Sequence, residues 1–270
     1  MSRKRDEARR VFGERAEMYV TSATHADPDV LSRVVEMLDA GLDALATESG
    51  RSQPLYHAHL PPGLPQVEAL TQSLLRGDIA TARSIALRAF AARGDYVVIA
   101  TRLFQPALYR IGVLWQQNEI TVAQEHLATA ISQNVLSQVY LRATFAPSTD
   151  RRALFAGIAG NEHVLGLRMV SDAFELDGWS VQYLGANTPT DSLLAQIDAW
   201  RPEVVGLSVS LVQQLSELKH AVSSIRERFG NGCPTIIVGG IPINQITGIW
   251  RWTGAVEWSA DAGKAVSAML

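Results

Sequence analysis

Apolar residues recur at intervals of three and four positions from residue 66 to residue 146. The first stripe is formed by Val67, Leu70, Leu74 and Leu75, and later ones by Ala82, Ile85, Ala86 and Ala89, by Ile99, Leu103, Leu108, Ile111 and Leu114, and by Ala123, Leu127, Ala130, Ile131 and Val135. Short polar breaks at 76–78, 93–95 and 118–119 separate these stripes. Because such stripes mark helices with one buried face, the segment is predicted to be a four-helix bundle with short connections.

The pattern changes after the bundle, where apolar runs of strand length alternate with amphipathic segments. Strands are predicted at 153–157, 181–184, 204–209, 235–238 and 256–258. Helices are predicted at 164–177, 190–200, 212–229 and 261–270. Regular alternation of strand and helix indicates a doubly wound parallel sheet, so residues 147–270 are predicted to form a Rossmann-like α/β domain.

Two further segments precede the bundle. Residues 1–47 have helical patterning and are predicted to be an N-terminal helical segment. Residues 48–65 contain four prolines and two glycines, which cannot continue a helix, and are predicted to be a Pro-rich linker. The chain is therefore predicted to combine an all-α part with an α/β domain.

Composition narrows the function classes. The 270 residues are 47% apolar with a net charge of −3, which predicts a sizeable core and does not favour a nucleic-acid-binding surface over the whole protein. The single cysteine, Cys233, excludes an intramolecular disulfide and suits a reducing compartment. No apolar run approaches the roughly 20 residues of a membrane span, and the charged N-terminus is no secretory signal. We expect a cytoplasmic protein without membrane contact.

Candidate chemistry gathers where the predicted strands end. The sequence Asn-Glu-His-Val-Leu-Gly (161–166) follows the first strand, Gly-Leu-Ser-Val (206–209) closes the third, and Val-Gly-Gly (238–240) closes the fourth. Ligands of open α/β sheets bind in the crevice outside the carboxyl ends of parallel strands. We therefore expect a binding site that includes a histidine, His163, and several small residues.

This set resembles the Asp-x-His-x-x-Gly … Ser-x-Leu … Gly-Gly signature of cobalamin-binding domains. The resemblance implies that His163 is the lower axial ligand of the corrinoid cobalt, as neutral imidazole suits a borderline transition metal. It also implies that four small residues surround the displaced nucleotide tail, namely Gly166, Ser208, Gly239 and Gly240.

Two positions depart from the signature. Asn161 stands in place of the acidic residue that holds the second imidazole nitrogen, and an uncharged amide would tune the ligand less strongly. Ser210 replaces the leucine of Ser-x-Leu. Both positions are still expected in the cofactor site.

A second motif lies in the predicted bundle, where Trp115 is followed after nine residues by Glu125 and His126. It resembles the Trp-x9-Glu-His motif of CarH-type cobalamin photoreceptors. That resemblance implies that the bundle covers the upper face of adenosylcobalamin, with the three side chains around the 5′-deoxyadenosyl group, and that light breaks the cobalt–carbon bond. The family's histidine after the tryptophan is Gln116 here, a poor cobalt ligand, so water or His126 would fill the upper site after photolysis.

The N-terminal part departs from CarH-type repressors, because no DNA-binding domain is recognised in it. The related photocobilins pair a cobalamin domain with a bilin, and His57 and His59 of the linker suit a bilin's propionates and pyrrole nitrogens. Biliverdin is therefore a possible second chromophore, alongside the reading of this segment as an ordinary exposed linker. A homo-oligomer, dimer or tetramer, and a downstream effector protein are the expected partners.

Three functions compete. The first is a light sensor that is not an enzyme. The second is a methyl-carrying corrinoid protein serving partner methyltransferases, which needs an open upper face and is disfavoured by the bulky Trp115. The third is a cobalamin-dependent isomerase subunit, which would need a radical-generating barrel on another chain.

Overall fold

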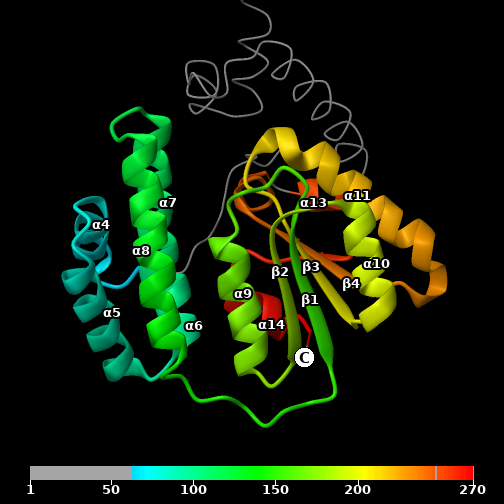
Figure 1. The fold of residues 1–270 in the computed structure, drawn as a ribbon, viewed down its shortest axis with the longest axis horizontal. Helices are drawn as coiled ribbons and strands as arrows, with labels where there is room; N and C mark the ends of the chain where they lie inside the picture. Colours follow the sequence, from blue (N-terminus) through cyan, green and yellow to red (C-terminus); the bar gives the residue numbers. More distant parts are fainter. Residues whose placement is uncertain (1–62, 247, 270) are drawn as a thin grey trace, which may run out of the picture.

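The computed structural model describes residues 63–246 and 248–269. The predicted helical segment 1–47 and the linker up to residue 62 lie outside the described residues. Figure 1 shows a helical bundle on one side and an α/β domain on the other.

Four helical stretches form the bundle, as the apolar stripes predict. They are α4 (Val67–Leu75), α5 (Ile79–Arg93), a long helix made of α6 (Tyr96–Ile99), η2 (Ala100–Phe104) and α7 (Gln105–Gln116), and α8 (Val122–Tyr140). The polar breaks act as caps: Asp78 and Asp95 accept the backbone N–H groups of Thr81 and Val98. Thr121 begins α8 with a capping box to Gln124.

The long helix contains one π-helical turn, η2. It ends two residues before Pro106, which has no N–H to donate to the carbonyl of Arg102 one turn earlier. That carbonyl instead accepts the N–H of Leu64, at 2.7 Å, so the entering chain satisfies the group that proline leaves free. The turn carries Thr101, which lines the cavity described below.

The continuous helix Tyr96–Gln116 is long and apolar enough to cross a membrane by length and composition alone. The segment is not a continuous apolar run, because polar residues such as Arg102 and Gln105 are scattered through it. Core helices of folded bundles pass the same test. Its buried residues Leu103, Phe104 and Ile111 belong to the bundle core.

The α/β domain contains a five-stranded parallel sheet of order β2-β1-β3-β4-β5. The strands are β1 (Arg152–Ile158), β2 (Ser180–Thr188), β3 (Val204–Ser208), β4 (Thr235–Gly239) and β5 (Glu257–Trp258). The helices are α9 (Leu165–Leu176), α10 (Thr190–Trp200), α11 (Leu215–Phe229) after the short η3 (Val212–Gln214), α12 (Ile241–Gln245), α13 (Ile249–Thr253) and α14 (Ala262–Ser267), with the short η4 (Gly230–Gly232) after α11. The chain order reverses between β1 and β3, which makes the carboxyl ends of these strands the topological switch point.

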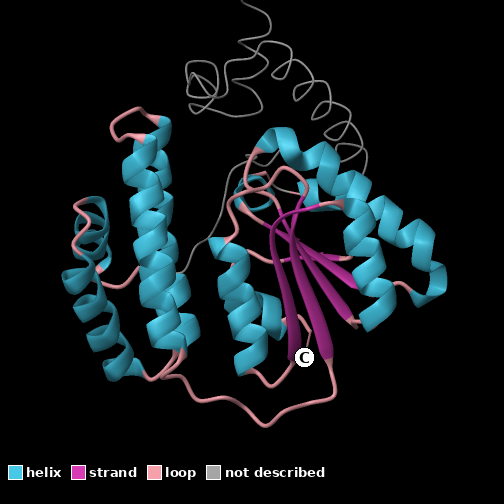
Figure 2. Ribbon diagram, viewed as in Figure 1, coloured by secondary structure: helices cyan, strands magenta, loops and turns pink. Residues whose placement is uncertain are grey.

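Helices cover both faces of the sheet, so the prediction of a doubly wound fold is confirmed (Figure 2). Alternate residues of β1 point to opposite faces: Leu154 and Ala156 pack with α10 and α11, whereas Phe155 packs with α9 and α14. Leu165 and Met169 of α9 belong to the bundle core as well. Helix α9 therefore lies between the bundle and the sheet.

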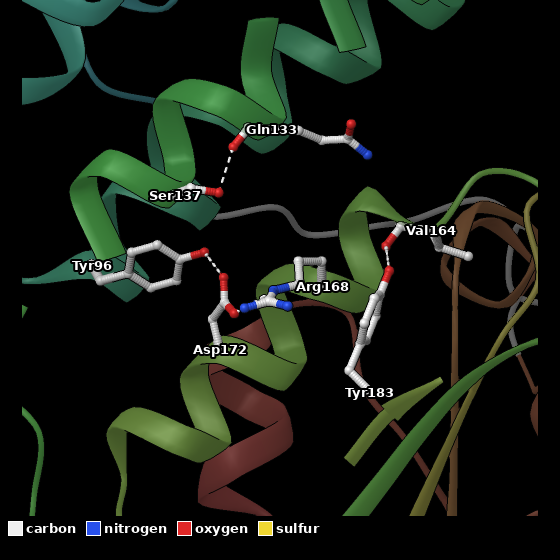
Figure 3. Close-up of polar contacts among 7 residues, drawn as sticks. All are labelled: Tyr96, Gln133, Ser137, Val164, Arg168, Asp172 and Tyr183. Carbon is white, nitrogen blue, oxygen red and sulfur yellow. Dashed lines mark hydrogen bonds and ion pairs between the residues drawn. The ribbon is translucent and has the colours of Figure 1, made fainter. Parts of the chain in front are cut away.

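A polar link ties α9 to the bundle (Figure 3). Asp172 of α9 is 3% exposed, accepts the Tyr96 hydroxyl of α6 at 2.5 Å and pairs with Arg168 at 2.6 Å. Burial raises the pKa of the Asp172 carboxyl, while Tyr96 and Arg168 oppose that rise. The guanidinium of Arg168 also lies over the rings of Tyr183 and Tyr140, so it bridges the sheet and the bundle.

Removing this carboxylate should loosen the contact between bundle and sheet. In Asp172→Ala, the Tyr96 hydroxyl and the Arg168 guanidinium lose their shared acceptor, so the free energy of unfolding should fall by about 2–3 kcal/mol. Asp198→Ala, which removes a partly exposed ion pair on α10, is the matched control and should cost about 0.5 kcal/mol or less. Urea denaturation measures both; equal losses would contradict the structural role of Asp172.

Candidate cofactor-binding site

A cavity of about 590 Å³ lies between the bundle and the carboxyl ends of the strands. Its bundle wall comes from η2, α7 and α8, and its sheet wall from the loop after β1, the start of α9, the ends of β3 and β4, and the loop after β5. A deeper part continues between the sheet and α9, along Phe155, Gly206 and Val170. The site thus combines a broad space between two domains with a crevice at the switch point.

The loop that carries His163 is held by hydrogen bonds to its backbone. Asn161 is fully buried; its Nδ2 donates to the Ser208 carbonyl at 2.9 Å, and its Oδ1 accepts the backbone N–H of His163 at 3.2 Å. Ser210 Oγ donates to the His163 carbonyl at 3.0 Å. These contacts fix the backbone and leave the exposed His163 side chain on the cavity wall.

The start of α9 is fixed from the sheet as well. The Tyr183 hydroxyl of β2 donates to the carbonyl of Val164, the residue before α9, at 3.3 Å (Figure 3). Val164 directly follows His163, and Arg168 packs over the Tyr183 ring. The His163 loop is therefore joined, through α9, to the polar link with the bundle.

The glycines of the site serve different purposes. Gly240 has φ of +119°, and a Cβ there would lie 1.7 Å from the Val209 carbonyl oxygen, so the fold itself requires glycine. A Cβ on Gly206 would lie 2.3 Å from the Phe155 ring. By contrast, a Cβ on Gly166 would meet nothing within 4 Å, so packing within the chain does not demand a glycine there. Gly166 lines the cavity, and the absence of a side chain there would let a ligand approach the backbone closely.

The bundle wall carries the second motif. Trp115 and Gln116 come from the end of α7, and Glu125 and His126 from the start of α8. Glu125 is 15% exposed in its side chain and accepts the Thr129 hydroxyl at 2.9 Å. His126 Nε2 lies 3.6 Å from the Glu125 carboxylate, and its ring is 69% exposed. This corner offers an indole surface together with a carboxylate and an imidazole.

All but one of the residues predicted for the site line this cavity. They are Trp115, Glu125, His126, His163, Gly166, Ser208, Ser210, Gly239 and Gly240. Asn161 does not, because its amide lies behind the loop and binds backbone groups, and its oxygen faces the His163 N–H instead of the imidazole. The sequence analysis missed the cavity-lining Gln105, Tyr109 and Asn244.

A sequence signal for two of the missed residues exists. Gln105, Tyr109, Gly112 and Gln116 follow one another at spacings of four, three and four, which places them on one helical face beside Trp115. Asn244 belongs to a five-residue helix and carries no periodic signal.

The donor set suits a metal that arrives within a larger cofactor. Within residues 63–246 and 248–269, no cluster of three or more His, Cys, Asp or Glu side chains could hold a metal ion by itself. The exposed imidazole of His163 can supply one axial ligand when a macrocycle supplies the equatorial ligands. The residues present therefore fit a corrinoid better than a bare ion.

Comparison with known proteins agrees with this geometry. Two family profiles, both described as B12 binding domain, match residues 151–264 and 66–140. The chain is 34% identical over 138 residues to the HTH-type transcriptional repressor CarA of Myxococcus xanthus, which covers 50% of this chain and 44% of that protein. It is 27% identical over 165 residues to the HTH-type transcriptional repressor CarH of the same organism, covering 58% and 54%.

The chain thus spans about half the length of the curated relatives it matches. Among solved structures, the monomethylamine corrinoid protein of Methanosarcina barkeri has a TM-score of 0.67 at 16% identity, over 75% of this chain and 95% of that one, which is a likeness of fold. The two B12-binding matches fall on the bundle and on the α/β domain, the two walls of the cavity. The chain belongs to the B12-binding family, which its two matches cover over residues 66–140 and 151–264, and the relatives that it resembles there are the repressors CarA and CarH.

Proposed function

We propose that this protein is a light sensor that binds adenosylcobalamin in the cavity between the bundle and the Rossmann-like domain, and that it is not an enzyme. The observation that carries the proposal is that His163 from one domain and Trp115, Glu125 and His126 from the other line the same cavity. These are the residues that a cobalamin needs below the cobalt and that an adenosyl group needs above it.

Each wall has a separate task. On the sheet side, His163 would supply an imidazole ligand to the cobalt, with its backbone held by the contacts of Asn161 and Ser210. The crevice past Ser208, Gly239 and Gly240 takes the nucleotide tail. When bound, adenosylcobalamin supplies a cobalt–carbon bond that green or near-ultraviolet light breaks.

On the bundle side, Trp115 packs against the adenosyl group and excludes water. Glu125 and His126 hydrogen-bond the ribose or the adenine. Loss of the adenosyl group on illumination would remove packing between the two domains. The altered arrangement of the bundle and the Rossmann-like domain, or of subunits, would carry the signal. The curated relatives are repressors by name, which supports a regulatory output. We propose that this output acts through a homo-oligomer or an effector protein.

A spectrum of the protein with adenosylcobalamin, recorded in the dark and after green light, tests this function. The sensor predicts a bound cobalamin spectrum that converts on illumination. Binding of methylcobalamin without binding of adenosylcobalamin would favour a methyl carrier instead, and binding of neither would overturn the cobalamin reading of both motifs.

His163→Ala should weaken binding of adenosylcobalamin and abolish the base-off, His-on spectrum. Loss of a metal ligand should cost at least the 10- to 100-fold in affinity that is typical of losing an outer-shell partner, so we expect about 100-fold. His220→Ala removes an exposed histidine of α11 outside the cavity and should bind as the unaltered protein does. A His163→Ala protein with unchanged affinity and spectrum would refute the ligand assignment.

Trp115→Ala should discriminate between cobalamins. The lost packing on the adenosyl group should weaken adenosylcobalamin binding by about 2 kcal/mol, or roughly 30-fold, and methylcobalamin binding far less, because a methyl group is too small to fill the same corner. Isothermal titration in the dark measures both constants. Equal losses for the two cobalamins would argue against an adenosyl pocket at this corner.

A bilin would extend the absorption to the red. His57 and His59 lie outside the described residues, so this part of the proposal rests on their side-chain chemistry alone. Biliverdin added to the protein should then produce a new red band that weakens in a His57→Ala, His59→Ala double variant and persists in His220→Ala. The absence of any red band in the unaltered protein would exclude the second chromophore.

A further inference from the structure

Four polar groups meet where α7 of the bundle touches the α/β domain. We call them the seam cluster: the side chains of Gln105, Tyr109 and Asn244 and the carbonyl of Ala260. Gln105 Nε2 donates to the Ala260 carbonyl at 3.1 Å and to the Tyr109 hydroxyl at 3.4 Å. Asn244 Nδ2 donates to the same two oxygens, at 3.1 and 3.2 Å. All four residues line the cavity.

The chemistry of the groups fixes their orientation. A backbone carbonyl can only accept, so both amides must turn their nitrogen, not their oxygen, toward Ala260. Each NH₂ group has two hydrogens, one for the carbonyl and one for Tyr109. Both lone pairs of the Tyr109 oxygen are then used, and the capacity that remains is its own proton.

Two hydrogen-bonding functions of the cluster therefore lack a partner in residues 63–246 and 248–269. One is the Tyr109 proton, since both hydrogen bonds of its hydroxyl are accepted ones. The other is Asn244 Oδ1, a fully buried atom of a residue that is only 6% exposed. A buried acceptor without a donor is destabilising, and because Asn244 lines the cavity, a ligand group that reaches this oxygen would supply the missing donor.

The charge of the cavity selects the ligand group. Its described lining includes the acids Glu125, Glu162 and Asp261 and contains neither lysine nor arginine. At the seam cluster itself, where Asp261 directly follows Ala260, an anionic group would be repelled, whereas a neutral group would not. A primary carboxamide is neutral, and it carries one acceptor oxygen and N–H donors side by side, the complement of one free donor and one free acceptor.

We propose that the seam cluster reads a single carboxamide on the periphery of the bound corrinoid. Tyr109 donates its proton to the amide oxygen, and Asn244 Oδ1 accepts an amide N–H. Because that oxygen is shielded from solvent, the Asn244 side chain must shift slightly as the amide enters. Gln105 is a positioning residue that keeps the Tyr109 hydroxyl a donor. This inference rests on the proposed cobalamin binding. Both domains would then hydrogen-bond the corrin periphery independently of the adenosyl group.

The test uses methylcobalamin and its monocarboxylic acids, in each of which one peripheral amide is a carboxylate. With the full chain in the dark, one acid should bind at least tenfold more weakly than methylcobalamin, because it presents no N–H to Asn244 and adds a negative charge. Tyr109→Phe should bind methylcobalamin about tenfold more weakly, because the amide oxygen loses its donor. Asn244→Ala removes the acceptor that the acid cannot satisfy, so the discrimination against that acid should fall to about twofold.

Tyr140→Phe is the matched control, since it removes the same atom from a tyrosine of α8 that does not line the cavity. It should keep both the affinity and the discrimination. The ratio of two ligands on one variant does not depend on the folded fraction, so a partly unfolded variant still gives an answer. Methylcobinamide, which lacks the nucleotide tail but keeps the amides, separates the amides from the tail phosphate as the group that is read.

Three results would overturn the proposal. Discrimination that persists in Asn244→Ala would show that Asn244 Oδ1 does not accept the amide N–H. A loss for methylcobalamin with none for methylcobinamide would show that Tyr109 meets the phosphate. If the protein binds adenosylcobalamin in a light-responsive way and Tyr109→Phe has unchanged affinity, the role of the seam cluster is refuted and the proposed function stands. If the unaltered protein binds no corrinoid, both are refuted.

Discussion

The candidate site depends on one buried side chain, the amide of Asn161. It lies at the switch point of the sheet and connects the end of β3, through the Ser208 carbonyl, to the loop after β1, through the His163 N–H. The Ser210 hydroxyl, which donates to the His163 carbonyl, and Gln214, which donates to the Gly160 carbonyl, join the same two strand ends. Together these contacts hold His163 at the mouth of the crevice, and α9 starts directly behind it.

That connection extends to the bundle. Helix α9 carries Arg168 and Asp172, which meet Tyr96 of the bundle, and its first turn packs in the bundle core. The His163 loop, α9 and the bundle helices thus belong to one packed assembly. A change in what fills the cavity acts on a contact between domains, which is the property a sensor needs.

Much of the fold could be predicted from the sequence, because the residues that start and end its helices act on their near neighbours in the chain. Asp78 and Asp95 mark helix starts, and Gly94 ends α5 with φ of +70°. Longer-range effects were not predictable: β2 extends to Thr188 beyond the expected 181–184 because Gly185 and Asn187, both with positive φ, let the strand bend beside β1. The helices α12 and α13 have five residues each, too few to show a period.

The site was predictable where motifs carry it and not where tertiary packing makes it. His163 and Trp115 come from recognisable spacings, whereas Asn244 lies on the short helix α12 and meets Tyr109 of α7 only in the folded protein. Asn161 illustrates the limit. Its position in the motif suggests a hydrogen bond to the imidazole, but in the folded loop its oxygen accepts the backbone N–H of His163.

The central claim is that light on the bound cofactor changes how the two walls of the cavity are arranged. Small-angle X-ray scattering of the adenosylcobalamin-loaded protein, recorded in the dark and after green light on one sample, tests it most directly. The account predicts a change in the radius of gyration or in the molecular mass that accompanies the spectral conversion. Identical scattering from a sample whose spectrum has fully converted would contradict it.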